Sequence, residues 1–128
     1  MLANMEALAA KKSVAEELWR TVTEKGLDSA VKQYRQLRST RSEDYNFSEG
    51  ELDELGFRLL GHKRVNEAIR ILELNAEVYP LSWYVFDSLG EVYMRTGDRE
   101  RAIKSYHRSL QLNPINTNAT DKLKQLTN

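Results

Sequence analysis

The sequence repeats itself at an interval of 34 residues, and this periodicity constrains the fold more than any other feature. Shifting the chain by this interval superimposes two copies of one pattern, in which the matched pairs are Leu55 and Leu89, Gly56 and Gly90, Ala68 and Ala102, Ile69 and Ile103, and Pro80 and Pro114. The register continues further, because Asp53, Asp87 and Asp121 are equally spaced. A fixed period of this length indicates stacked repeats, which favour a binding role over a catalytic one.

Each copy predicts a pair of helices joined by a tight turn. Ser48 followed by Glu51 has the spacing of a capping box, in which both side chains satisfy free N–H groups at a helix start. Apolar residues then recur at helical spacing in both copies, as Leu52, Leu55 and Leu59 and as Phe86, Leu89 and Tyr93. In the second copy the sequence Thr96-Gly97-Asp98 predicts a break, and a second helix presents Ala102, Ile103, Tyr106 and Leu110 on one face. That helix ends before Pro114, because the residue preceding a proline avoids helical geometry.

Two glycines fall inside the predicted first helices, where glycine costs about 1 kcal/mol relative to alanine. Close approach of two helix backbones explains Gly56 and Gly90, with the small Ala68 and Ala102 expected opposite them. Gly90→Leu is therefore predicted to destabilise the fold by roughly 1 to 3 kcal/mol through overpacking.

The repeated unit resembles the tetratricopeptide repeat, whose pattern combines W-x2-L-G-x2-Y, A-x3-F and P. The matching residues of one copy are Phe86, Leu89, Gly90, Tyr93, Ala102, Tyr106 and Pro114, and those of the other are Leu52, Leu55, Gly56, Leu59, Ala68, Leu72 and Pro80. Phe86 and Leu52 replace the tryptophan, and Asn75 and Ser109 stand where a small alanine is usual. The resemblance implies an all-α fold, a right-handed superhelix of helix pairs.

The expected organisation is a single domain spanning 1–128, with about seven helices. It comprises a degenerate repeat at 13–48, full repeats at 49–82 and 83–116, and a capping helix at 117–128. In the degenerate repeat, a helix running from Leu2 to Lys25 is expected to turn at Gly26, with Asp28 capping its partner helix. This repeat is offset by 38 residues instead of 34, and the additional residues are placed in the polar run Ser39 to Asp44.

Composition narrows the function classes. The chain has 19 basic and 19 acidic residues, and this balance argues against a nucleic-acid surface. It has no cysteine, which excludes disulfides and thiolate metal sites. No apolar stretch has the length of a membrane span, and the first residues lack the pattern of a signal peptide. We expect a cytoplasmic chain as written, or a periplasmic one if it belongs to an exported parent.

A search for catalytic patterns finds one formal match. Ser29 and Lys32 have the S-x-x-K spacing of penicillin-recognising serine enzymes, but the companion motifs K-T-G and S-D-N are absent. His62 and His107 are solitary, and neither has the paired spacing of a metal site. The prediction is a chain with no enzymatic activity, no metal site and no cofactor.

The resemblance also implies a concave groove lined by the first helices of successive repeats. Carried onto this sequence, the positions that face such a groove are Trp19, Asp53, Phe57, Leu60, Tyr84, Asp87, Glu91, Met94 and Asp121. The alternative for the apolar members, Phe57 and Leu60, is simple packing on neighbouring helices. The carboxylates have a corresponding alternative as solvating residues.

The predicted partner is a protein or peptide. Chaperone-binding members of the family hold a terminal carboxylate with lysine and asparagine side chains, whereas the corresponding groove here bears Asp53, Phe57 and Asp87. A basic or apolar peptide is therefore expected to bind better than an acidic C-terminal tail.

A second resemblance concerns context and leaves the function open. The segments from Ala30 to Tyr34, Tyr45 to Glu49 and Trp83 to Glu91 are similar to helical tails that follow β-lactamase-type serine hydrolase domains in bacteria. Three hypotheses follow: a stand-alone scaffold that binds a partner in its groove, an accessory or self-associating module without activity of its own, and an enzyme in its own right. The third requires hydrolysis that Ser29→Ala abolishes, and none is expected.

Overall fold

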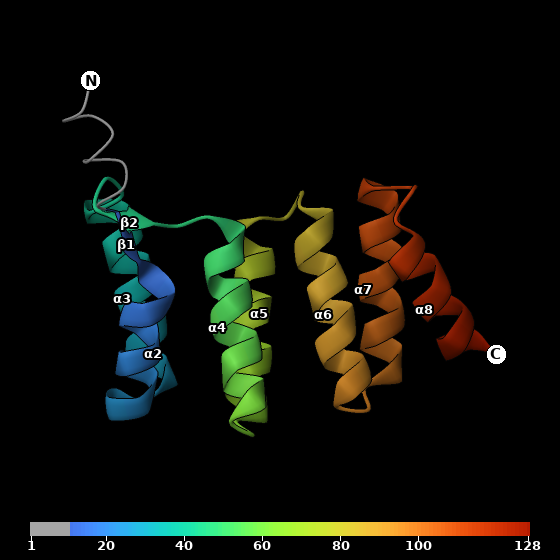
Figure 1. Ribbon diagram of the computed structural model, residues 1–128, viewed down its shortest axis with the longest axis horizontal. Coiled ribbons are helices and arrows are strands. Elements are labelled where there is room, and N and C mark those ends of the chain that lie inside the picture. The colour runs from blue at the N-terminus through green and yellow to red at the C-terminus, as the bar shows by residue number, and fades with distance from the viewer. Residues whose placement is uncertain (1–10) are drawn as a thin grey trace. The chain divides into compact units, whose positions relative to one another are not determined.

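The structure is a computed structural model that describes residues 11–128, and Figure 1 shows the course of the chain. The elements, in chain order, are β1 (Lys12–Ser13), α2 (Val14–Lys25), α3 (Leu27–Thr40), β2 (Tyr45–Asn46), α4 (Glu49–Gly61), α5 (Val65–Val78), α6 (Trp83–Arg95), α7 (Arg99–Leu112) and α8 (Thr117–Thr127). The predicted all-α fold is confirmed, because the described residues form seven helices and only two strands of two residues each. The chain divides into two compact units, the first ending at Leu55 and the second beginning at Gly56.

The start of α2 corrects two predictions about the first unit. The predicted helix from Leu2 to Lys25 is wrong in part: residues 1–10 lie outside the described residues, and α2 begins only at Val14 because Ser13 caps it by accepting from the Glu16 N–H. The predicted capping box is also wrong. The Glu51 carboxylate accepts from Ser13 Oγ at 2.7 Å and from the Ala15 N–H at 3.2 Å. Glu51 therefore serves the N-terminus of α2, where a negative charge is favourable, and not that of its own helix.

The turn between α2 and α3 depends on Gly26. This residue has a φ of 96°, and its N–H donates to the carbonyl groups of Thr21 and Val22. Gly26 also occupies the N-cap position of α3, and Asp28 lies within the first turn. The prediction that Asp28 caps α3 is therefore wrong, although its charge still lies at the favourable end of the helix.

A short extended segment follows α3. The helix continues through Ser39 and Thr40, so the polar insertion begins later than predicted, at Arg41, whose Nε donates to the Asp44 carboxylate at 2.8 Å. Tyr45 and Asn46 then pair in parallel with Lys12 and Ser13. Tyr45 is buried, and this pairing positions the residues that precede α4 beside the start of α2.

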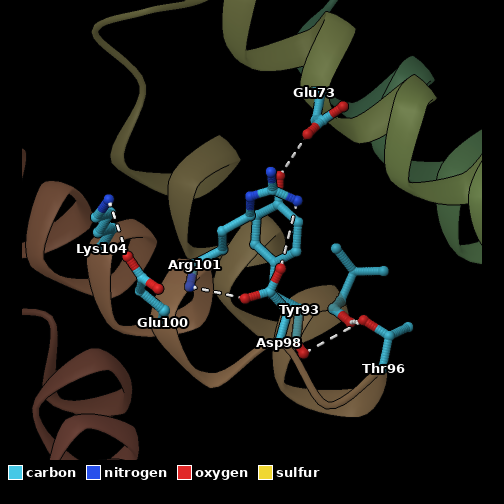
Figure 2. Close-up of polar contacts among 8 residues, drawn as sticks. Glu73, Tyr93, Thr96, Asp98, Glu100, Arg101 and Lys104 are labelled. Atoms are coloured by element: carbon cyan, nitrogen blue, oxygen red, sulfur yellow. Dashed lines mark hydrogen bonds and ion pairs between the residues drawn. The ribbon is translucent and has the colours of Figure 1, made fainter.

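In the second unit the α6–α7 turn forms as its sequence predicts. Gly97 adopts a φ of 86°, and the Asp98 carboxylate caps α7 by accepting from the Arg101 N–H at 3.1 Å. Figure 2 shows this turn, with the Thr96 hydroxyl bonded back to the carbonyls of the preceding helical turn. Helices α5 and α7 end two residues before Pro80 and Pro114, as expected for a residue that cannot continue a helix.

Gly56 and Gly90 explain how closely the helices of each pair approach. An ideal Cβ at Gly56 would lie 2.5 Å from the Leu72 side chain, and one at Gly90 would lie 2.7 Å from the Tyr106 ring. The expected close approach is present, but the groups opposite the glycines are large and are not Ala68 and Ala102. Each glycine provides a hollow that a bulky side chain of the partner helix fills.

Candidate functional site

One side of α6 carries four of the predicted groove residues, which we call the Tyr84 row: Tyr84 is exposed, and Asp87, Glu91 and Met94 are half-buried. Tyr84, Asp87, Glu91 and Met94 recur every three or four positions, so they share one side of the helix. The opposite side carries Val85, Leu89, Val92 and Tyr93, all buried. Ser82 fixes where this helix begins, because its hydroxyl accepts from the Val85 N–H. Tyr84 is exposed and makes an edge-on contact with the Trp83 ring.

The apolar members of the predicted groove have a double role. Phe57, Leu60 and Met94 are half-buried, and all three pack against a core cluster formed by Leu72, Leu89, Val92, Tyr93 and Ala102. Core packing accounts for the buried part of each side chain. Met94 of the Tyr84 row packs against this cluster and also against a second one formed by Tyr106, Ala119 and Leu123.

Arg95 joins this face, although the sequence analysis did not select it. Its guanidinium carbon lies 5.7 Å from the centroid of the Phe57 ring, and one of its nitrogens lies 2.8 Å from the Glu91 carboxylate. The spacing of Glu91 and Arg95, four residues apart on a helix, is the signal that predicts this ion pair. The ring of Phe57 therefore already holds a cation next to a carboxylate.

Asp87 is bound by the last helix. Its carboxylate accepts from Asn116 Nδ2 at 2.9 Å and from Asn118 Nδ2 at 3.0 and 3.2 Å. Asn116 also caps α8 by accepting from the Ala119 N–H, and it donates to Ser109 Oγ at 2.9 Å. These contacts fix the Asp87 side chain, so its first role is to attach α8.

The remaining predicted site residues come from other helices. Trp19, half-buried in α2, and Asp53, buried in α4, belong to the first compact unit. Asp121 is exposed on α8 in the second unit. The structure thus brings together Phe57, Glu91 and Met94 with Arg95, and it attaches Asp87 to α8.

An open hollow of about 400 Å³ lies between α5 and α6, lined by Glu73, Ala76, Glu77, Phe86 and Leu89. Phe86 and Leu89 are not members of the Tyr84 row, so this hollow is separate from the predicted groove. Glu73 accepts a hydrogen bond from the Tyr93 hydroxyl at 2.6 Å, as Figure 2 shows. The hydroxyl thereby links α6 to α5 beside the hollow.

Two buried tyrosines have pKa values raised above the usual value of about 10. Burial is the main cause for both; the Tyr93 pKa is raised further by the hydrogen bond to Glu73, and the Tyr106 pKa by the nearby charges of Asp87 and Glu91.

Above pH 10 the unfolded chain releases these protons and the folded chain keeps them, so the free energy of unfolding decreases as pH rises. Each tyrosine should contribute up to about 1.4 kcal/mol per pH unit. Urea denaturation between pH 9 and about 11 measures this slope. Tyr93→Phe should reduce it, and an unchanged slope would contradict the assignment.

The formal S-x-x-K match lies in the first unit. Ser29 and Lys32 are exposed and line a second open hollow of about 310 Å³, together with Thr21, Lys25, Gln33 and Gln36. His62 Nδ1 lies 2.9 Å from the Arg58 carbonyl oxygen, just after α4 ends. Among residues 11–128, no group of histidine and carboxylate side chains is arranged to hold a metal ion. Within the same residues, no helix combines the length and the apolar character that a membrane span requires.

Comparison with known proteins finds a family likeness for the second of the two full repeats, residues 83–116. A search among curated proteins finds no match to this chain. The sequence model of the tetratricopeptide repeat family matches residues 83–116, the segment that contains α6, the Gly97 turn and α7. Repeats of this family generally mediate contacts between proteins. The α6–α7 helix pair, which carries the Tyr84 row, is thus similar to a tetratricopeptide repeat.

Proposed function

We propose that this chain is a protein-interaction scaffold that binds a basic or apolar peptide segment across Phe57 of α4 and the Tyr84 row of α6. The observation that carries the proposal is the arrangement of Phe57, Arg95 and Glu91, in which an aromatic ring and a carboxylate jointly hold a cation. A lysine or arginine of a partner would find the same two groups. Tyr84 and Met94 would supply apolar contact on either side.

The interactions that hold Arg95 are weak enough for a partner's cation to replace it. A cation over an aromatic ring at an exposed site contributes about 0.5–1 kcal/mol, and an exposed ion pair about 0–1 kcal/mol. The side chains of Arg95 and Glu91 are 59% and 42% exposed, so their pairing belongs to this weak class. A peptide that adds backbone and apolar contacts to its cation can therefore compete with Arg95.

Charge sets the preferred class of partner. The proposed face of the second unit includes the carboxylates of Asp87, Glu91 and Asp121, with Arg95 as its cation. A free acidic tail would meet repulsion there, whereas a basic segment would be attracted. Trp19 and Asp53 belong to the first unit and stay predicted contact residues there.

Isothermal calorimetry with two synthetic probe peptides tests this proposal. One probe alternates lysine and leucine and has an amidated C-terminus; the other alternates glutamate and leucine and ends in a free carboxylate. The basic probe should bind, and Tyr84→Ala or Glu91→Lys should each weaken it about tenfold. Asp87 is left unchanged, because its substitution would release α8.

Glu100→Lys provides the matched control for these variants. It makes the same charge change as Glu91→Lys on α7, where the Glu100 side chain is 81% exposed and pairs with Lys104. The control should keep most of the affinity. Binding of the acidic probe alone would overturn the proposed preference, and equal losses in Glu91→Lys and Glu100→Lys would show that the α6 face is not the binding surface.

A further inference from the structure

Large apolar side chains are exposed at one end of the second unit. Leu81 is 77% exposed, Ile115 is 85% exposed and Trp83 is 41% exposed, and we call these three residues the apolar edge. Leu81 and Ile115 occupy the same position in successive 34-residue copies, each directly after a proline. Figure 1 shows that the α5–α6 and α7–α8 connections, which carry them, lie at the same end of the helices. Large exposed apolar groups on two connections at the same end of a unit indicate a contact surface.

The distribution of charge marks the same end. Residues 78–86 and 112–120, which surround the apolar edge, contain no charged side chain, although 30% of the whole chain is charged. The opposite end of the unit is rich in charge: Lys63 and Arg64 lie in the α4–α5 turn, and five charged residues lie between 95 and 101. The two ends of the helices therefore present surfaces of opposite character.

Buried polar contacts hold the apolar edge in one arrangement. Ser109 Oγ donates to the Trp83 carbonyl at 2.9 Å, and Asn116 Nδ2 donates to Ser109 Oγ at the same distance. Ser109 is fully buried and Asn116 is 7% exposed. This chain of contacts connects the start of α6 to the start of α8, so both loops are fixed before any partner arrives, which reduces the entropy lost on association.

We propose that the apolar edge pairs with the apolar edge of a second copy of this chain, forming a weak symmetric dimer. In a two-fold contact each edge meets the same surface, so the uncharged residues 78–86 and 112–120 face each other. The nearby charges of Arg108 and Asp87 keep the hydrogen-bond partners that they have within their own chain. The exposed parts of the three side chains amount to roughly 400–500 Å² per copy, or about 800–1,000 Å² in a dimer, which is at or just below the lower limit of specific interfaces. The dimer should therefore dissociate readily.

Other occupants fit the apolar edge less well. A lipid surface is usually engaged by apolar groups together with clustered lysine and arginine. Arg108 lies near this edge, but it already donates to the Pro80 carbonyl and to Gln111. A different protein that recognises its partner through charge would find no charged side chain in residues 78–86 and 112–120.

Sedimentation velocity over low to high micromolar concentrations tests the proposal. The native chain should show reversible association, and the double variant Leu81→Ser, Ile115→Ser should raise the dimer dissociation constant by about tenfold or more. Both side chains are largely exposed, so the variant should fold normally, which circular dichroism checks. Val65→Ser is the matched control, because Val65 is 37% exposed but lies at the first residue of α5, away from this edge.

Each remaining outcome overturns the proposal. A native chain that stays monomeric at every concentration would do so, as would association that the double variant does not weaken or that Val65→Ser weakens equally. Co-sedimentation with neutral phosphatidylcholine vesicles, lost in the double variant while the native chain stays monomeric, would assign the edge to a lipid surface instead. Neither substituted residue belongs to the proposed peptide face, so the probe peptides test that face independently.

Discussion

Gly90→Leu is expected to lower the free energy of unfolding by about 3 kcal/mol, the upper end of the range predicted from the sequence, because a single added methyl group already has no space. An ideal Cβ at Gly90 would lie 2.7–2.8 Å from three atoms of the Tyr106 ring. Tyr106 is fully buried and packs with Ala119 and Leu123, so its ring has no free volume into which to move. Gly90→Ala should therefore destabilise by about 1–3 kcal/mol, although helix propensity alone predicts a gain of about 1 kcal/mol.

Gly61→Ala separates the steric effect from the effect of propensity. An added Cβ at Gly61, the last residue of α4, meets no atom within 4 Å. This control should be neutral or stabilising by up to about 1 kcal/mol. Urea denaturation of each variant supplies the free energies. If Gly90→Ala is as harmless as Gly61→Ala, the close approach of α6 and α7 described here is wrong.

Asn116→Ala is expected to cost about 2–4 kcal/mol, which exceeds the effect of an ordinary helix cap. The substitution removes the cap of α8, the hydrogen bond to Ser109 and the hydrogen bond to the charged carboxylate of Asp87. Ser109 is fully buried, so its hydroxyl would lose one of its partners out of contact with water. Helix α8 would then be held mainly by the apolar packing of Ala119 and Leu123 on Tyr106.

Ser82→Ala is the matched control, because Ser82 occupies the equivalent position one repeat earlier. Its side chain makes the capping contact with the Val85 N–H, and the expected cost is about 1 kcal/mol. Asn116→Asp keeps a capping oxygen but places a second carboxylate beside Asp87, so it should also destabilise at neutral pH. Equal costs for Asn116→Ala and Ser82→Ala would show that the contacts to Asp87 and Ser109 contribute little.

The sequence predicts most of the fold because the determinants of the full repeats are local. Ser82, Gly97 and Asp98 act within a few residues of their own positions, and each adopts the role that its residue type favours. The degenerate repeat was harder to predict, because its geometry depends on a distant partner. Glu51 has the spacing of a capping box with Ser48, yet its carboxylate binds the N-terminus of α2, where it accepts from Ser13, 38 residues earlier in the sequence. Local spacing does not reveal such a competitor.

The candidate site was predictable as a helix face but not as a set of contacts. Periodicity places Tyr84, Asp87, Glu91 and Met94 on one side of α6, since helical spacing alone decides this. It does not show that Asn116 and Asn118 hold Asp87, or that Arg95 lies over Phe57. Both contacts join different helices, so they depend on packing that a single repeat does not encode.

The hydrogen bond between Ser13 and Glu51 shows that the boundary of the first compact unit does not coincide with the boundary between sequence repeats. A boundary drawn between copies, before residue 49, would sever α2 from the carboxylate that completes its first turn. The first compact unit instead extends to Leu55 and therefore includes the first turns of α4. A fragment that ends before residue 49 would lack Glu51, the hydrogen-bond partner of Ser13 and Ala15. Shortened versions of this chain that keep α2 should therefore retain all of α4.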